Sequence, residues 1–524
     1  MTLKRIILSV LTFIVALEMG ASLISSLREP QVGNQLQLYQ TDLLVQASEW
    51  DGSGLPADEV QQFRKAVFGE DALKSATEQY EEVRTDATAG IERLQQQIKA
   101  SLAQSGEPDQ QLTATAKSQQ LLVNQLDLRL GMVKAQQGEV DKALATWKTL
   151  AKDTANVSTR ADDQAIAAST LIDLWQTPPV VRPETATVIN SKLKGWFRYS
   201  ALERLYTLTN EPEQLTQLQT NERQSAQSTI IQLSVVGLLP SFGGLLGSIG
   251  LIALIGQRLL KGKQSILALP EGQWEVPWDW ETVWLVVVGG FLFVGQIALP
   301  LVLQLGISAS QSVLVVPEVA FANGWALALS ARGKALYSLV FYLLMAASTL
   351  GVLYWSIRAY LPLPKDWFRF KLFDKWPLWG FGSYLVALPL MLGISLLNQQ
   401  IWQGQGGNNP ILQLVLEERD PVALGMFFFT AAVAAPVFEE ILFRGFLLPS
   451  LTRYMPIWGA IALSSLIFSA AHLSFSEVLP LTVLGAILGF AYVRSQNLLS
   501  SILLHSTWNS VTMLGLFLLG SGNS

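Results

Sequence analysis

The chain has 524 residues, of which 50% are hydrophobic and 15% are charged, and its formal net charge is −5. This length permits more than one domain, and this balance is typical of a membrane protein that also carries a soluble part. The absence of cysteine excludes disulfides, thiol nucleophiles and cysteine-ligated metals. With a modest negative charge and no basic stripe in the sequence, we expect no nucleic-acid partner.

The first apolar run is Ile6–Leu27, and Lys4 and Arg5 precede it. Its length of about 20 residues predicts an uncleaved signal anchor over residues 1–27, with the basic flank in the cytoplasm. Glu18 lies inside this run. Two interpretations of Glu18 stay open, a mildly polar helix face against other helices or a contact to an active core.

Residues 28–228 change character, because Gln, Glu, Asp, Lys and Ala dominate and apolar residues recur at helical spacing. We therefore predict a soluble helical domain here. One segment resembles a single tetratricopeptide-type hairpin, in which small residues let two helices approach closely. Its residues are Leu130-Gly131, Gly138, Ala143-Leu144 and Trp147. An ordinary hairpin and a partner-binding repeat both fit, so a protein partner of residues 28–228 is one expectation.

Residues 229–423 predict accessory membrane spans. The apolar runs are Ile230–Leu254, Val283–Leu305, Leu336–Ile357 and Leu378–Leu397. Basic residues follow the first run and separate the last two, which places these loops in the cytoplasm and residues 28–228 on the non-cytoplasmic side. Residues 308–330 fit either a loop on the membrane or a further short span. Tryptophans 274, 278, 280 and 284 predict an interfacial belt.

Residues 424–519 predict a core of four membrane helices. They are Leu424–Leu451, Ile457–Leu473, Val478–Val493 and Leu498–Leu519, joined by short turns that make neighbours antiparallel. The expected fold is therefore an all-α, multi-pass transmembrane bundle of about eight or nine spans with an N-terminal extramembrane helical domain. We expect an integral membrane protein, in the plasma membrane.

Three polar clusters interrupt these apolar core helices. They are Glu439-Glu440 with Arg444, Phe468 with His472, and His505 with Asn509, and they include both histidines of the chain. Ionisable groups inside a membrane are costly unless they face a partner or a cavity, so such groups mark a functional site by default. The clusters predict a catalytic or ligand-binding cavity.

The helical spacing of these residues suggests separate roles for the two glutamates. Residues four apart share a face, so Glu440 should pair with Arg444 while Glu439 points elsewhere. The turn before Ile457 joins the two helices that carry Glu439 and His472. Glu439 lies about 18 Å before this turn and His472 lies about 22 Å after it, so the two side chains are at similar depth. A desolvated Glu439 can take a proton from water.

The third cluster lies closer to the turn that precedes its helix than Glu439 and His472 lie to theirs. His505 comes 7 residues after Leu498, so a tilt or a kink is needed, and Pro436 is placed to supply one. His505 and Asn509 are four apart and suit the binding of a developing oxyanion. Phe468 shares the face of His472 and would wall the cavity.

These residues, in this order, resemble the CPBP family of intramembrane proteases, which includes the type II CAAX prenyl endopeptidases and bacterial relatives linked to bacteriocin self-immunity. The resemblance covers about Leu424 to Leu516. It implies an endopeptidase that hydrolyses peptide bonds of membrane-associated or prenylated proteins, with Glu439 and His472 activating water and His505 with Asn509 holding the oxyanion. Glu440, Arg444 and Phe468 would support the site.

The resemblance also bears on a metal, since the family is commonly described as metalloproteases. Glu439, His472 and His505 would be a suitable zinc set with one open position, but a glutamate-dependent mechanism without metal fits the same residues. Two other functions stay open. One is a non-catalytic scaffold or bacteriocin-immunity protein that binds partners through residues 28–228. The other is a transporter with a Glu and His proton relay, although the spans show no internal repeat.

Overall fold

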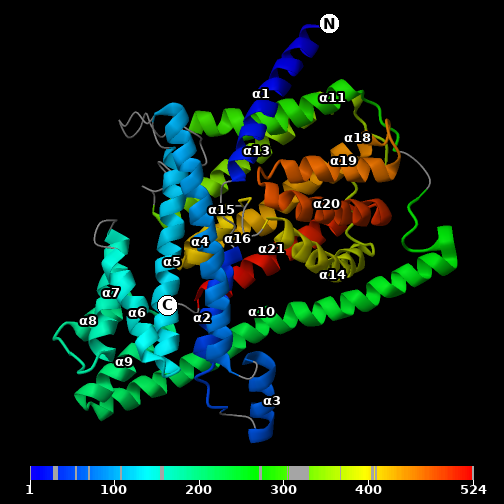
Figure 1. Ribbon diagram of the computed structural model, residues 1–524. Helices are drawn as coiled ribbons and strands as arrows, with labels where there is room; N and C mark the ends of the chain where they lie inside the picture. Colours follow the sequence, from blue (N-terminus) through cyan, green and yellow to red (C-terminus); the bar gives the residue numbers. More distant parts are fainter. Residues whose placement is uncertain are drawn as a thin grey trace. The chain divides into compact units, whose positions relative to one another are not determined.

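The computed structural model describes residues 2–27, 33–52, 56–68, 71–106, 109–153, 159–270, 274–303, 305, 330–365, 367–402, 406–407 and 410–521. Within these ranges every regular element is a helix (Figure 1), so the all-α prediction is confirmed. The chain divides into two compact units. The first contains Met1–Gln31 and Pro240–Phe517, and the second contains Val32–Leu239 and Leu518–Ser524.

The second unit is built from antiparallel helices. They are α2 (Gly33–Ala47), α3 (Ala57–Phe68), α4 (Ala72–Ser105), α5 (Gln110–Gln136), α6 (Val140–Asp153), α7 (Thr159–Trp175), α8 (Thr185–Lys192), α9 (Gly195–Thr209) and the first part of α10 (Pro212–Lys261). Helix α4 begins where the Asp71 side chain accepts from the backbone N–H groups of Leu73 and Lys74. It ends at Gly106, whose positive φ of 76° suits glycine.

The hairpin expected around Gly131 is formed by α5 and α6. Trp147 is fully buried, and its indole N–H donates to the carbonyl of Leu128 at 3.3 Å. A side chain on Gly131 would overlap the Trp147 indole, so the close packing of the two helices requires glycine there. Gly138 makes the turn with a φ of 84°.

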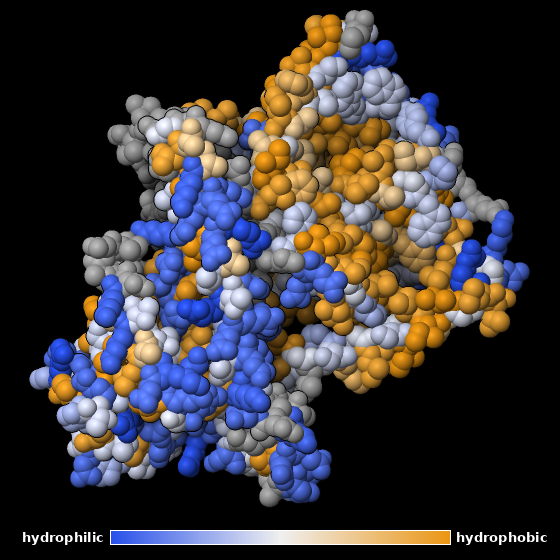
Figure 2. All heavy atoms as spheres, viewed as in Figure 1, coloured by the Kyte–Doolittle hydropathy of each residue, from blue (hydrophilic) through white to orange (hydrophobic). Residues whose placement is uncertain are grey.

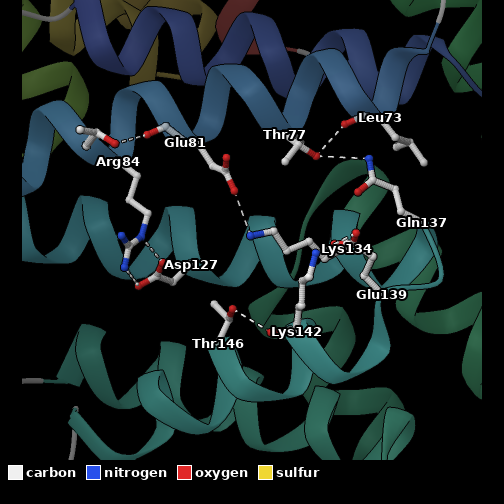
Figure 3. A network of polar contacts seen from close by, with 11 residues as sticks. Leu73, Thr77, Glu81, Arg84, Asp127, Lys134, Gln137, Glu139, Lys142 and Thr146 are labelled. Atoms are coloured by element: carbon white, nitrogen blue, oxygen red, sulfur yellow. Dashed lines mark hydrogen bonds and ion pairs between the residues drawn. The ribbon is translucent and has the colours of Figure 1, made fainter.

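Exposed ion pairs join α4 to α5 (Figure 3). Arg84 pairs with Asp127, and Lys134 lies 3.0 Å from Glu81. These pairs are partly in solvent, where each contributes about 0.2–1 kcal/mol, so the stability of the unit depends mainly on its buried groups.

A buried ionic cluster lies between α2, α4 and α5. The Arg129 guanidinium donates to both oxygens of Asp42, at 2.9 and 3.0 Å, and the Tyr80 hydroxyl donates to Asp42 at 2.7 Å. Asp42 is 3% exposed and Tyr80 is fully buried. Burial raises the pKa of Tyr80 well above its usual value, and the Asp42 carboxylate raises it further, so Tyr80 stays a neutral donor.

We expect Asp42→Asn to destabilise this unit by about 3–5 kcal/mol, because it leaves the Arg129 charge buried without its carboxylate. Hydrogen exchange of α2, α4 and α5 in the full chain measures the change. Asp127→Asn, which breaks the ion pair with the exposed Arg84, is the matched control and should cost less than about 1 kcal/mol. Equal losses in the two variants would contradict the prediction.

Among the described residues, eight helices are long and apolar enough to cross a bilayer, and each lies wholly or partly in the first unit. They are Leu3–Ser26 (α1), Pro212–Gln264 (α10 with its extension), Trp280–Leu303, Ala331–Tyr360, Trp376–Trp402, Pro421–Leu451, Phe475–Ser495 (α20) and Leu498–Gly520. Apolar side chains gather over the helices of this unit in Figure 2. The protein is a multi-pass integral membrane protein.

One of the expected spans differs from the structure. Helix α19 (Ile457–Ala470) has 14 residues, which is about 21 Å and shorter than the hydrocarbon core of about 30 Å. It therefore cannot cross a bilayer alone, in contrast to the span expected for Ile457–Leu473. The open question on residues 308–330 falls almost wholly on residues 308–329, which lie outside the described residues. Glu18 is exposed on α1, so it makes no buried contact with a core.

Helix α10 packs on α14 (Trp376–Trp402) at the Leu385 carbonyl of α14. Pro389 has no N–H to donate to the Leu385 carbonyl one turn earlier. Gly247 of α10 lies against this carbonyl so closely that any side chain there would overlap it. The missing hydrogen bond of α14 and the missing side chain of α10 thus occur at the same point.

Basic segments of this unit meet at one end of it. Arg5 donates to Glu281 at 2.6 Å, which joins the N-terminus to the start of α11 (Trp280–Trp284). The Trp367 indole donates to the Glu275 carbonyl at 2.9 Å, which brings in the basic loop before α14. These contacts bring the basic flank of the first span and the basic loop before α14 to the same end of the unit.

The tryptophan belt is only partly as expected. Trp278 is fully buried, and its indole donates to Ser450 at 2.9 Å. Trp274 is 9% exposed and stacks on Tyr492, whereas Trp280 is 46% exposed. The belt prediction is therefore wrong for Trp274 and Trp278, because the loop folds back over the bundle and its rings become protein core.

Candidate active site

The site is built on an irregular helix that contains the paired glutamates. Its segments are α16 (Pro421–Phe429), the π-helical η5 (Thr430–Ala434), α17 (Ala435–Glu439), the π-helical η6 (Glu440–Leu447) and α18 (Leu448–Leu451). Wider π-helical turns change the direction of the following side chains and are frequent at functional sites. Pro436 lies in the segment between them, so the expected disturbance ahead of Glu439 takes the form of π-helical turns.

Glu440 and Arg444 form the expected ion pair, and both are fully buried. Arg444 Nη1 donates to Glu440 Oε1 at 2.8 Å, and Nη2 donates to the Gly485 carbonyl of α20 at 3.1 Å. A Cβ at Gly485 would lie 2.9 Å from Ser465 Cβ, so glycine lets α20 approach. The Phe468 ring lies 4.6 Å from Arg444 Cζ, which gives the charge a cation–π contact.

His505 of α21 (Leu498–Ser521) lies between the two glutamates. Its Nδ1 is 2.9 Å from Glu440 Oε1, and its Nε2 is 3.8 Å from Glu439 Oε2. A carboxylate can only accept, so Nδ1 carries a proton and donates to Glu440. The longer separation exceeds a direct hydrogen bond, and so Nε2 faces Glu439 across a short gap.

Glu439 is the less buried of the two glutamates, with 13% of its side chain exposed against none for Glu440. Tyr342 of α13 (Ala331–Ile357) donates to Glu439 Oε1 at 2.8 Å. This contact was not predicted from the sequence, because Tyr342 is one of several tyrosines in an apolar helix and nothing in its spacing separates it from the others. Glu439 thus faces a tyrosine and an imidazole.

His472 lies in the turn that follows α19, beyond the end of the helix. Its Nδ1 donates to the Phe468 carbonyl at 2.9 Å, so Nε2 is the unprotonated nitrogen when the ring is neutral. The Phe468 ring contacts both histidines, with centroids 5.0 Å from His472 and 5.9 Å from His505. Gln296 donates to the Ala471 carbonyl at 3.1 Å and fixes this turn.

Asn509 points to a different partner from His505. Its Nδ2 donates to the Ala431 carbonyl of η5 at 2.7 Å. This bond fastens α21 to the glutamate-bearing helix one turn beyond His505. The two groups expected to hold an oxyanion thus both have protein partners, Glu440 for His505 and Ala431 for Asn509.

The suggested zinc set does not fit this geometry. Glu439 and His505 lie together, but in the part of the chain that the structure describes no three His, Asp or Glu side chains are grouped so that they could hold a metal ion. His472 Nδ1 donates to the Phe468 carbonyl, and the Phe468 ring contacts both histidines.

Comparison with curated proteins and with solved structures gives no match for this chain. Comparison with family models gives a match to the type II CAAX prenyl endopeptidase Rce1-like family at residues 421–511. The matched range contains all three polar clusters, from Glu439 to Asn509, so the family resemblance inferred from them is confirmed. Residues 421–511 therefore form an Rce1-like type II CAAX prenyl endopeptidase domain, which implies a CAAX-type protease built into a multi-pass membrane protein.

Proposed function

We propose that this domain hydrolyses peptide bonds in membrane-embedded or lipid-anchored protein substrates, with Glu439 as the general base that activates water. The observation that carries the proposal is the contrast between two adjacent glutamates. Glu440 is fully buried and bound by Arg444 and His505, whereas Glu439 keeps 13% of its side chain exposed and accepts a hydrogen bond from Tyr342 at 2.8 Å. Water can therefore reach Glu439 and not Glu440.

Hydrolysis of a peptide bond would require one group that takes a proton from water and one group that gives a proton to the leaving amine. A water on Glu439 attacks the scissile carbonyl carbon and passes its proton to the carboxylate. His472, with Nε2 free, and His505, with Nε2 toward Glu439, are the imidazoles that would return this proton to the leaving amine. Asn509 uses one amide N–H on Ala431, and its second N–H would remain for the oxyanion.

We propose that the mechanism depends on glutamate and not on a metal, since the three candidate ligands are not grouped. The supporting roles go to Arg444, which neutralises Glu440, and to Phe468, which packs on the guanidinium and on both rings. By loop charge, residues 28–228 would lie on the non-cytoplasmic side of a plasma membrane and could bind a protein partner there.

The test compares peptide fragments in membranes that contain the wild-type chain or Glu439→Gln. We expect fragments that only the wild type produces, no loss on adding a zinc chelator, and less than one bound metal ion per chain by mass spectrometry of the metal content. Loss of the fragments on chelation would contradict the metal-free mechanism. Identical fragments from both chains would contradict the protease, and would favour a scaffold that works through residues 28–228.

Tyr342→Phe should lower kcat by about 10-fold or more while leaving the fold intact, because it removes a hydrogen bond to the proposed base and almost no volume. Its effect is measured on kcat and KM with a substrate that the fragment comparison identifies. Tyr354→Phe, on an exposed position of the same helix, is the matched control and should leave both constants unchanged. An unchanged kcat in Tyr342→Phe would remove this residue from the site.

A further inference from the structure

The turn that carries His472 is not part of a regular helix. Helix α19 ends at Ala470, and the backbone N–H groups of His472 and Leu473 donate to the carbonyls of Ser469 and Ala470, each at 3.1 Å. Leu473 has a φ of 57°, a left-handed conformation that leucine rarely adopts and that persists only where the surroundings hold it. The position of the His472 ring therefore depends on what fixes this turn.

Gln296 supports the turn from another helix. It lies in the π-helical η2 (Leu285–Ala298), and its Nε2 donates to the Ala471 carbonyl at 3.1 Å. The last carbonyls of a helix have no partner within that helix, so this donor satisfies a group that α19 leaves open. The bond fastens the residue directly before His472 to a helix 175 positions earlier in the chain.

The polarity of Gln296 has a cost in stability. It is the only polar side chain of η2, and its Oε1 is buried with no hydrogen-bond partner within the described ranges. A buried polar atom without a partner destabilises a protein, and an apolar side chain of similar length would avoid that loss. Departures of this kind from apolar packing are expected where a side chain serves function. The amide therefore has a role other than filling space.

Helix η2 is held in place by α13, the helix that also reaches Glu439. At Gly290 and Gly295 of η2 a Cβ would lie 2.9–3.0 Å from side chains of α13, so the two helices can pack this closely only with glycine at these points. Tyr342 of α13 donates to Glu439 at 2.8 Å. One closely packed pair of helices thus contacts the proposed base through Tyr342 and the histidine turn through Gln296.

We propose that Gln296 is a positioning residue for His472, an inference that rests on the proposed function. By holding the Ala471 carbonyl, Gln296 limits the positions of the imidazole, whose unprotonated Nε2 would serve the leaving amine. A shift of about 1 Å in a reacting group can lower a rate by about 10²-fold. The chemistry then depends on a residue outside the family domain at residues 421–511.

The first test is Gln296→Met in the full chain, which removes the donor and keeps nearly the same length and volume. We measure the rate at which membranes form the fragments that distinguish the wild type from Glu439→Gln. The rate should fall by about 10- to 100-fold. The denaturation midpoint of the purified chain in detergent should stay the same, because the variant also removes the unpartnered oxygen. Gln400→Met, the same change at an exposed position of α14, is the matched control and should keep the wild-type rate.

A double-mutant cycle separates positioning from a general structural effect. In a His472→Gln chain, adding Gln296→Met should lower the rate by less than about twofold, because a positioning residue acts only through its target. In a Tyr342→Phe chain, which is altered at the other glutamate-facing contact, Gln296→Met should keep its full effect.

The proposal is overturned if Gln296→Met lowers the rate of the His472→Gln chain by its full factor, which would make Gln296 a structural residue. It is also overturned if Gln296→Met cleaves like the wild type while Glu439→Gln is inactive, and this outcome leaves the proposed function in place. Identical fragments from Glu439→Gln and the wild type would instead remove the proposed function, and this inference with it.

Discussion

Glu439→Gln is expected to lower the rate of peptide hydrolysis by about 10²- to 10⁴-fold, the usual contribution of a positioned general base. The amide keeps the size of the side chain and can still accept from Tyr342, which lies 2.8 Å from Glu439 Oε1, so the fold should be retained. It cannot take a proton from water. Initial rates on one cleaved substrate, with the amount of inserted protein measured in the same membranes, give the ratio.

The matched control is Glu18→Gln, which makes the same chemical change in another membrane span. Glu18 is exposed on α1 and lies outside the cluster, so its variant should keep the wild-type rate. A Glu439→Gln chain that cleaves at more than about a tenth of the wild-type rate would contradict the role of general base. Equal losses in the two variants would point to a general effect on insertion.

Arg444→Met is expected to destabilise the membrane unit by about 3–5 kcal/mol, because it leaves the fully buried Glu440 without its guanidinium partner. It also removes the bond to the Gly485 carbonyl and the contact with Phe468. Unfolding of the purified chain in detergent against a denaturant measures the loss.

Two further variants separate the ion pair from its surroundings. Glu440→Gln/Arg444→Met removes both charges and should recover part of the stability, since a neutral pair does not leave a charge buried. Arg332→Met, which breaks the exposed pair with Asp420 at 2.6 Å, should cost less than about 1 kcal/mol. If the double variant is at least as unstable as Arg444→Met, the two side chains are not coupled and the prediction is wrong.

The sequence by itself determines the features that depend on near neighbours in the chain. Apolar length identifies the membrane spans, because each helix satisfies its own backbone and needs only enough apolar residues to cross. The Glu440–Arg444 pair follows in the same way from residues four apart, and the glycine at 131 from the hairpin that it permits. The three polar clusters also mark the domain before any contact is known, since ionisable groups are rare in such segments.

Only the tertiary structure decides which groups meet across helices. Tyr342 reaches Glu439 over 97 residues, and His505 lies 2.9 Å from Glu440 and 3.8 Å from Glu439, although its depth in the sequence requires a tilt or a kink to bring it there. A depth taken from the sequence assumes regular α-helical turns, and the π-helical η5 and η6 on either side of Glu439 change both the depth and the facing of the side chains. The rotation and tilt of each helix are set by packing between distant segments, so they cannot be read from local periodicity.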